Sequence, residues 1–284
     1  MNPTSDGMKK LKIAFQGEKG AYSEIAAKHF FRGTSIDLFP FNTFADAIHS
    51  VVSKKVDRGV IPVENTLGGG IREVFSLLDE EPVYGIGEIR LKISHSLLAI
   101  RGATLSSIKN VYSHPQALLQ CRKFIHQKKL KRIEYYDTAG AAKFVSGSGD
   151  KSIAAIASEA AAEDYGLIVL KRHLESDGHN FTRFMIVSRD YSVRPDADKT
   201  CIVFGLRNRP GELHRALSVF AIRDIDLLSI ESIPIVRKPW DYEFFVDFRG
   251  SVADERQSNA ISHLREISPH VKVVGSFRSG RTIL

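Results

Sequence analysis

Thr182 and Arg183 stand where a polar loop, residues 176–181, meets a short apolar run, residues 184–187. The apolar run is typical of a buried strand, so both residues are expected to enter a sheet. A hydroxyl held at such a place can donate a hydrogen bond to a leaving oxygen. Threonine is also a common strand residue, because β-branched side chains fit there. Successive strand residues face opposite ways, so Arg183 is expected to point away from Thr182.

Three further loops place small polar residues between a strand and a helix. Ser113 in YSHPQ and Thr138 in YDTAGAA occupy predicted cap positions, and the glycines of GEKGAYSE precede a helix that should begin near Ser23. Ordinary capping, worth about 1 kcal/mol, explains any one of them. Together they also present free N–H groups that suit carboxylates or phosphates. The chain has no Gly-Lys-Thr loop and no Gly-x-Gly-x-x-Gly after a strand, which favours carboxylates over nucleotides.

Asn65 follows an apolar run in IPVENTLGGG and precedes a run of glycines. A turn followed by a helix start would account for this pattern. A second interpretation is a side-chain amide held at a strand end, where the glycines let the backbone approach a ligand closely. The residues alone leave both interpretations open.

The elements that must position these residues alternate between strand and helix. This rhythm favours a parallel sheet with helices on both faces. An extended stretch, residues 83–100, interrupts it and is long enough to cross between two lobes. We therefore expect two α/β lobes with a ligand cleft between them. The predicted strands are 11–15, 36–41, 59–63, 110–113, 132–137, 152–157 and 167–170, and the predicted helices are 21–30, 44–52, 71–80, 115–125, 139–145 and 158–165.

A different module follows a polar, proline-containing linker at residues 189–199. Its elements occur in the order βαββαβ, which is typical of a ferredoxin-like unit. The predicted strands are 200–206, 227–236, 242–248 and 271–277, and the predicted helices are 211–224 and 255–267.

The composition limits the classes of function. The chain has 284 residues, 43% of them hydrophobic and 26% charged, as expected for a globular protein of one large or two ordinary domains. A net charge of +7 favours anionic partners weakly. The basic run 128–132 fits a helix end, and no dense basic cluster with interleaved aromatic residues indicates nucleic-acid binding.

Cys121 and Cys201 lie in apolar segments and form no spaced metal motif, so they are expected to be small buried residues in a reducing compartment. The first ten residues lack the apolar core of a signal peptide. No run approaches the roughly 20 apolar residues that span a bilayer, so we expect a cytoplasmic protein without membrane contact.

Six motifs occur in one order: GEKGAYSE, PVENTLGG, SHPQALLQC, YDTAGAA, AAIASEAAAEDYGLIVL and NFTRF. In this order they resemble the motifs of prephenate dehydratases and of the closely similar arogenate dehydratases. The segments NRPGELHRAL and IESIP resemble the ACT regulatory domain that follows in that family. The resemblance implies a catalytic domain at residues 10–188, with two lobes like a periplasmic binding protein, and an ACT domain at residues 200–280.

The resemblance implies a hydro-lyase of phenylalanine biosynthesis that converts prephenate to phenylpyruvate, water and carbon dioxide without a metal or an organic cofactor. Arogenate, which would give phenylalanine directly, is the alternative substrate. Thr182 matches the threonine regarded as catalytic in the family. Arg183 falls in the substrate-binding group by its motif, although its predicted direction favours ordering of the loop. The substrate-binding candidates are Asn65, Ser113, Gln116, Gln120, Thr138, Ser23, Arg183 and Phe184.

The resemblance also implies that L-phenylalanine binds between two ACT modules of a homodimer or homotetramer and inhibits the enzyme. Two positions depart from the family's ACT motifs: His214 replaces an apolar ring, and Ile233 replaces an arginine. We expect His214 to face solvent and the change at Ile233 to weaken or alter the inhibition. The candidate effector-binding residues are Asn208, Pro210, Gly211, Leu213, Glu231 and Ser232.

Two other classes of function compete with the enzyme. A two-lobed fold can bind small anions without turnover, since fold alone does not fix function. An amino-acid sensor with a vestigial cleft is the third class. The presence of both Thr182 and Asn65 counts against the binding protein, and the absence of a DNA-binding helix pair counts against the sensor.

Overall fold

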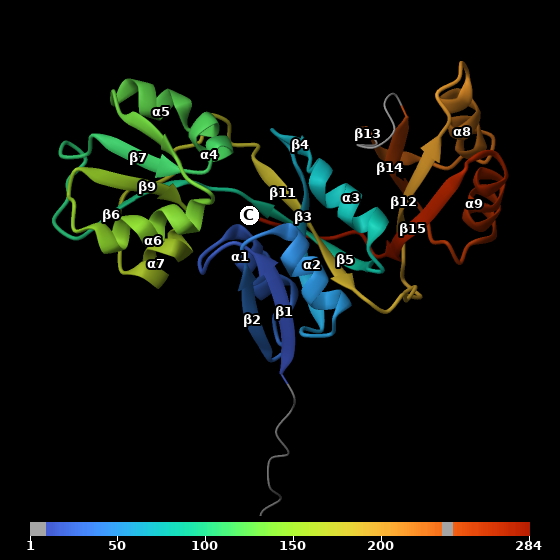
Figure 1. Ribbon diagram of the computed structural model, residues 1–284, viewed down its shortest axis with the longest axis horizontal. Coiled ribbons are helices and arrows are strands. Elements are labelled where there is room, and N and C mark those ends of the chain that lie inside the picture. The colour runs from blue at the N-terminus through green and yellow to red at the C-terminus, as the bar shows by residue number, and fades with distance from the viewer. Residues whose placement is uncertain (1–9, 235–240) are drawn as a thin grey trace, which may run out of the picture.

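The computed structural model describes residues 10–234 and 241–284 and has three parts (Figure 1). Two lobes form the part drawn in blue, green and yellow, and a C-terminal module in orange and red lies beside the first lobe. The first lobe contains β1 (Leu11–Gln16), α1 (Tyr22–Phe30), β2 (Ile36–Phe41), α2 (Phe44–Val52), β3 (Arg58–Asn65), β4 (Gly69–Gly70), α3 (Arg72–Glu80), β5 (Tyr84–Lys92) and β11 (Phe181–Ser188).

The sheet of the first lobe is mixed, whereas the sequence pattern predicted a parallel one. β1 pairs in parallel with β2 and β3, as expected, but β11 pairs antiparallel with both β3 and β5. The chain leaves for the second lobe along β5 and returns along β11, so these neighbouring strands run in opposite directions. In this register Thr182 on β11 lies opposite Asn65 on β3.

The second lobe carries its own five-stranded sheet, in the order β10-β6-β9-β7-β8. The predicted helix 115–125 is two helices that meet at Cys121, and the extended stretch 83–100 divides into β5 and a strand of this second sheet. Alanines of α6, α7 and β9 fill the core of the lobe. Its elements are β6 (Ser96–Ala99), β7 (Asn110–Ser113), α4 (Pro115–Gln120), α5 (Arg122–Gln127), β8 (Lys131–Glu134), α6 (Thr138–Ser148), β9 (Ile153–Ala157), α7 (Glu159–Tyr165) and β10 (Ile168–Lys171).

The C-terminal module has the predicted βαββαβ order and the ferredoxin-like strand order β13-β14-β12-β15. Residues 235–236 of the predicted strand 227–236, and the first nine residues on which the signal-peptide prediction rests, lie outside the described residues. A short strand, β16 (Thr282–Ile283), returns to pair with β5. The other elements are β12 (Lys199–Leu206), α8 (Glu212–Ala221), β13 (Leu227–Pro234), β14 (Tyr242–Arg249), α9 (Glu255–Ile267) and β15 (His270–Phe277).

The module joins the first lobe through one continuous sheet, in which β15 pairs with β5 where Gly275 meets Gly85. A Cβ on Gly275 would lie 2.3 Å from the Gly85 carbonyl oxygen, so this crossing requires glycine. Beside it, the rings of Phe75 on α3 and Phe245 on β14 stack with centroids 4.3 Å apart. Ile233, 3% exposed, belongs to the same core cluster. An apolar side chain packed in this core therefore occupies the position where the family often has an arginine.

Across the described parts of the chain, no helix is long and apolar enough to cross a membrane. Cys121 and Cys201 are buried and unpaired, as predicted.

Candidate active site

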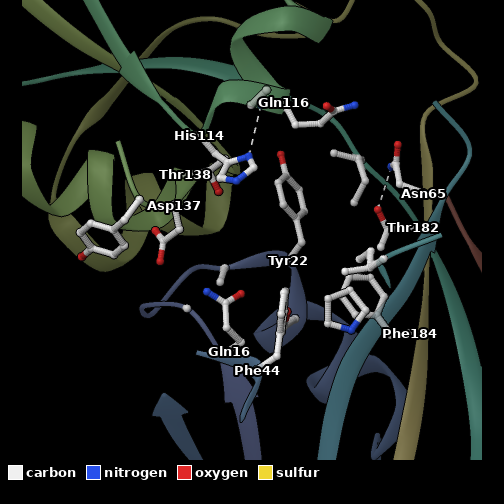
Figure 2. Close-up of a pocket in the computed structure, with 18 of the residues that line it drawn as sticks. Gln16, Tyr22, Phe44, Asn65, His114, Gln116, Asp137, Thr138, Thr182 and Phe184 are labelled. Carbon is white, nitrogen blue, oxygen red and sulfur yellow. Dashed lines mark hydrogen bonds between the residues drawn. The ribbon is translucent and has the colours of Figure 1, made fainter. Parts of the chain in front are cut away.

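A cavity of about 420 Å³ lies between the two lobes, a size that suits a small organic ligand (Figure 2). Both lobes contribute polar groups, and Phe44 and Phe184 from the first lobe give it an apolar wall. The polar residues that border it include Gln16, Tyr22, Ser23, Asn65 and Thr182 from the first lobe and its returning strand, and His114, Gln116, Gln120, Asp137 and Thr138 from the second.

Thr182 and Asn65 form a fixed pair on neighbouring strands. The Asn65 side-chain oxygen accepts hydrogen bonds of 3.0 Å from the backbone N–H groups of Leu67 and Gly68, which sets the orientation of the amide. Asn65 Nδ2 therefore faces Thr182 and donates to its Oγ1 at 3.0 Å. Because Oγ1 accepts this bond, the hydroxyl proton of Thr182 is free to be donated elsewhere. Both interpretations of IPVENTLGGG thus apply, since Asn65 braces the turn and also presents an amide.

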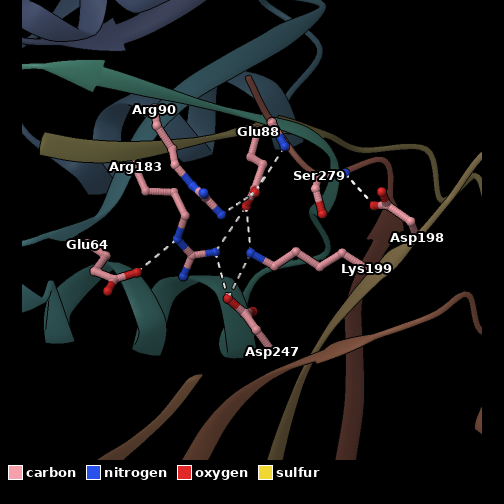
Figure 3. A network of polar contacts seen from close by, with 9 residues as sticks. Glu64, Glu88, Arg90, Arg183, Asp198, Lys199, Asp247 and Ser279 are labelled. Atoms are coloured by element: carbon pink, nitrogen blue, oxygen red, sulfur yellow. Dashed lines mark hydrogen bonds and ion pairs between the residues drawn. The ribbon is translucent and has the colours of Figure 1, made fainter. Parts of the chain in front are cut away.

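Arg183 does not border the cavity, although Thr182 and Phe184 on either side of it do, and its side chain lies in a network of charged groups (Figure 3). Its guanidinium forms ion pairs with Glu64 at 3.0 Å, Glu88 at 3.2 Å and Asp247 of the C-terminal module at 2.8 Å. The predicted direction of its side chain is confirmed. Its place among the substrate-binding candidates was wrong, because strand alternation puts it on the other face of the sheet.

The predicted helix caps at Ser113 and Thr138 were each wrong by one residue. The cap of α4 lies one residue after Ser113, and the cap of α6 lies one residue before Thr138. Ser113 is fully buried at the end of β7, and its hydroxyl donates to the Ile156 carbonyl at 2.6 Å. The cap of α4 is His114, whose Nδ1 accepts from the backbone N–H of Gln116. Thr138 is the first residue of α6 and does border the cavity, while Asp137 caps that helix. Ser113 does not border the cavity and is no longer a candidate ligand.

The other predicted substrate-binding residues border the cavity. Gln116 and Gln120 enter from α4, Ser23 from the start of α1, and Phe184 from β11. Gln120 is only 9% exposed and takes part in a buried hydrogen-bond chain.

Among the residues that border the cavity, sequence reasoning missed Gln16, Tyr22, Phe44, His95, His114 and Asp137. It also missed Asn180, which lies behind the cavity and bonds to Asn65 and Gln120. A signal existed for two of them: His95 is an isolated histidine in the stretch that crosses between the lobes, and Asn180 begins the motif NFTRF.

The titratable groups of the cavity are shifted mainly by burial. Burial lowers the pKa of His114 and of His95, so both imidazoles are neutral at pH 7. Burial raises the pKa of Tyr22, which stays protonated, and also raises the pKa of Asp137. One oxygen of Asp137 accepts from the Gly140 N–H, whereas Oδ2 is buried without a hydrogen-bond partner. Apart from the carboxyl groups of Glu73 and Asp137, the polar residues that border the cavity carry neutral amide, hydroxyl and imidazole groups, which can donate hydrogen bonds to an anionic ligand. Within residues 10–234 and 241–284, no cluster of three His, Cys, Asp or Glu could hold a metal ion.

The predicted effector residues lie on the C-terminal module. Gly211 has φ +82° at the start of α8, a conformation that favours glycine, and Leu213 beside it is 39% exposed. His214 is exposed, as predicted. Asn208 and Pro210 precede this helix, and Glu231 and Ser232 lie on β13. In one chain, β14 separates β13 from the strand that leads to Gly211.

The fold and the cavity define a two-lobed α/β ligand-binding unit followed by a ferredoxin-like module. Residues 13–192 match the family model described as prephenate dehydratase, and residues 201–257 match the ACT domain model. The chain belongs to the prephenate dehydratase family and carries a C-terminal ACT domain.

Named relatives cover nearly the whole chain. Arogenate dehydratase 2 of Petunia hybrida is 40% identical over 95% of this chain and 72% of its own length. The solved prephenate dehydratase of Arthrobacter aurescens, in complex with L-Phe, superimposes with a TM-score of 0.86 at 29% identity, covering 94% of this chain and 90% of that one. A protein described as a quorum quenching acylase, GqqA, has a TM-score of 0.85 at 32% identity, covering 95% and 98%.

Proposed function

We propose that the protein is a prephenate dehydratase, which converts prephenate to phenylpyruvate, water and carbon dioxide. The observation that carries this proposal is the Thr182 hydroxyl, which accepts from Asn65 and so has its own proton available for the cavity. In the reaction the bond to the ring carboxylate breaks, its electron pair makes the ring aromatic, and the ring hydroxyl leaves. Thr182 donates its hydroxyl proton to that oxygen, which leaves as water, and Thr182 then regains a proton from solvent, so that one proton is consumed in each turnover.

The rest of the cavity suits the other groups of the substrate. Phe44 and Phe184 form an apolar wall, beside which the charge of the ring carboxylate is poorly solvated, and this favours its loss as neutral carbon dioxide. We assign the side-chain carboxylate to the donors Gln116, Gln120 and Thr138 on the second lobe. Closing the lobes on the substrate would bring these donors and Thr182 to opposite ends of one molecule.

The test is ultraviolet detection of phenylpyruvate formed from prephenate. Thr182→Ala should lower kcat by about 10²-fold or more, the usual effect of losing a donor to a developing charge. Thr182→Ser keeps the hydroxyl and should retain most of the activity. Near-normal turnover by Thr182→Ala would show that Thr182 is only a strand residue.

Arogenate is the second candidate substrate, and Asp137 favours it. Its buried Oδ2 makes no hydrogen bond within the described residues, although the backbone N–H groups of Glu18 and Ala139 oppose the rise in the carboxyl pKa, and such an oxygen is unfavourable unless a ligand supplies a donor. The ammonium group of arogenate could do so, whereas the keto group of prephenate could not. Asp137→Asn should therefore lower kcat/KM for arogenate more than for prephenate, in parallel assays of phenylalanine and phenylpyruvate. An unchanged ratio of the two kcat/KM values would show that Asp137 does not discriminate between the two substrates.

The name of GqqA suggests acyl transfer as another reaction, but the hydrogen bond between Thr182 and Asn65 fits it less well. A nucleophilic hydroxyl needs a base that accepts its proton. The partner of Thr182 Oγ1 is the Asn65 amide nitrogen, which donates and cannot take a proton. This polarity supports a hydroxyl that acts as a donor.

We further propose that L-phenylalanine regulates the enzyme through Asn208, Pro210, Gly211, Leu213, Glu231 and Ser232. The complex of the Arthrobacter relative with L-Phe supports phenylalanine as the ligand, and the six residues are those that match the family's ACT motifs. The apolar packing of Ile233 against the first lobe leads us to expect a different coupling from that of relatives with arginine there.

We also propose a homodimer or homotetramer in the cytoplasm. The edge strand β13 exposes Leu228 and Ile230 by 41% and 42%, and a second copy would cover them. The unpaired, buried Cys121 and Cys201 are compatible with a reducing compartment.

A further inference from the structure

A chain of buried side chains leads from Thr182 into the junction between the lobes. Its four members, which we call the amide relay, are Asn65, Asn180, Gln120 and His95. Asn65 Nδ2 donates to Asn180 Oδ1 at 2.8 Å, and Asn180 Nδ2 donates to Gln120 Oε1 at 2.9 Å. His95 Nε2 lies 2.8 Å from the same Gln120 oxygen. Asn180 is fully buried and His95 is 2% exposed, so solvent does not compete for these bonds.

The polarity of the relay is set at Asn65. Two backbone N–H groups hold its oxygen, and a backbone donor cannot become an acceptor. Asn65 Nδ2 therefore faces Asn180, which must turn its oxygen toward Asn65 and its nitrogen toward Gln120. Gln120 in turn must present its oxygen to Asn180, because two amide nitrogens facing each other would leave neither satisfied.

The same logic fixes the proton of His95. Gln120 Oε1 can only accept, so the histidine nitrogen beside it, Nε2, must carry the hydrogen. His95 Nδ1 then faces the Tyr22 hydroxyl at 3.0 Å as an acceptor, and Tyr22 shares its single proton between this nitrogen and the Ser94 carbonyl, which lies 2.6 Å away. The ring is neutral at pH 7 because burial lowers the pKa of His95. The two backbone donors at Asn65 therefore assign the Nε2–H form, whereas a Tyr22 proton held wholly by the Ser94 carbonyl would assign the Nδ1–H form.

The consequence for the cavity concerns Gln120. Its oxygen is engaged by His95 and Asn180, and within the described residues its Nε2 makes one long bond, 3.5 Å to Asn180 Oδ1. Gln120 borders the cavity, so this nitrogen is available as a donor to an anionic ligand. If Gln120 reversed, an oxygen lone pair would face the substrate in place of an N–H.

We propose that His95 is a positioning residue, whose Nε2–H holds Gln120 in the orientation that presents a donor to the substrate. The inference rests on the proposed function for its kinetic effect, but the tautomer itself does not. Through the relay, residues outside the cavity determine that Gln120 and Thr182 both present hydrogen-bond donors to it. Turning the Gln120 amide around would break its bonds to His95 and Asn180.

The first experiment measures the tautomer directly. In ¹⁵N-labelled protein, long-range proton–nitrogen correlation of the ten histidines should show His95, identified by its loss in His95→Gln, as the Nε2–H form at neutral pH. Asn180→Asp replaces the nitrogen that faces Gln120 by oxygen, so Gln120 should reverse and His95 should change to the Nδ1–H form. An Nδ1–H tautomer in the unmodified protein, or no change in Asn180→Asp, would overturn the proposal.

The second experiment measures kinetics. His95→Asn places its amide near Nδ1 and loses the bond to Gln120, so kcat/KM should fall about tenfold or more, as is typical when a supporting partner is removed. His95→Gln places a nitrogen near Nε2 and should keep activity within about threefold. His173→Asn is the control, since His173 is exposed, has a φ of +53° that asparagine tolerates, and contacts Ser94 and Glu175 at the edge of this region.

Equal losses in His95→Asn and His95→Gln would reduce His95 to a packing residue and overturn the proposal. If the unmodified protein had no dehydratase activity, the proposed function would fail, while the tautomer experiment would still decide the polarity of the relay.

Discussion

Lys199→Met tests the buried charge network that joins the catalytic domain to the ACT domain. Lys199 Nζ lies 2.8 Å from Glu88 and 3.1 Å from Asp247, and Arg183 contacts the same two carboxylates. The four side chains are 0–7% exposed, and their two positive and two negative charges balance. Met is similar in length to Lys but carries no charge, so the substitution leaves one negative charge buried without compensation.

Removal of one partner from a buried ion pair costs about 3–5 kcal/mol. We expect that loss in the free energy of unfolding of Lys199→Met, measured by urea denaturation followed by circular dichroism. Lys10→Met is the matched control, because Lys10 pairs with Asp37 at a distance of 3.2 Å with side chains 57% and 47% exposed. An exposed pair of this kind contributes about 0–1 kcal/mol.

The stability that the charge network contributes should depend on pH. The lysine and the arginine lower the pKa of Glu88 and of Asp247 against the opposing effect of burial. A lowered carboxyl pKa stabilises the fold above the pKa of the unfolded chain, and this stabilisation is lost as the pH falls through the folded pKa. The difference between the unmodified protein and Lys199→Met should therefore be large at pH 7 and shrink in acid.

Two results would refute this reasoning. One is a loss in Lys199→Met no larger than that in Lys10→Met. The other is strict additivity with Glu88→Gln, because the second substitution removes the excess negative charge and should restore part of the stability.

Three further predictions concern the ACT domain. Gly275→Ala should lower the melting temperature markedly, since its Cβ would meet the Gly85 backbone at 2.3 Å, whereas Gly147→Ala, with nothing within 4 Å, should be neutral or slightly stabilising. Calorimetry should detect phenylalanine binding, and no binding at millimolar phenylalanine would contradict this. Lys272→Met should keep that binding but weaken the inhibition, because Lys272 Nζ on β15 donates to three backbone carbonyls at the end of α3. Light scattering should show at least a dimer, weakened by Ile230→Asp, and a concentration-independent monomer would contradict it.

The sequence predicted the local elements well because their signals are local. Alternating apolar runs and caps located most strands and helices, and the βαββαβ order of the ACT domain is confirmed. Strand direction was harder to predict, because the antiparallel pairing of β11 follows from the path of the chain between lobes and not from the residues of β11. Ser113 shows the same limit, since its hydroxyl bonds to Ile156, 43 residues away.

The site was predictable as a set of motifs but not as a hydrogen-bond pattern. Thr182 and Asn65 are 117 residues apart, and only the register of β11 with β3 makes them partners. His95 and Asn180 were missed because a lone histidine or asparagine in a polar stretch has no periodic signal. Their roles appear only when each donor and acceptor has been paired with its neighbour.

β11 links the two functions of the chain through the alternation of its side chains. Thr182 faces the cavity and Arg183 faces the charge network that includes Lys199 and Asp247 of the ACT domain. The next strand repeats the pattern, because Asn65 faces Thr182 while Glu64 binds Arg183. A shift of the ACT domain that moved Asp247 would pull on Arg183 and thus on the residue beside the reactive hydroxyl. Since the donor geometry must hold to within about 0.5 Å for efficient catalysis, a small displacement of β11 is enough to change turnover.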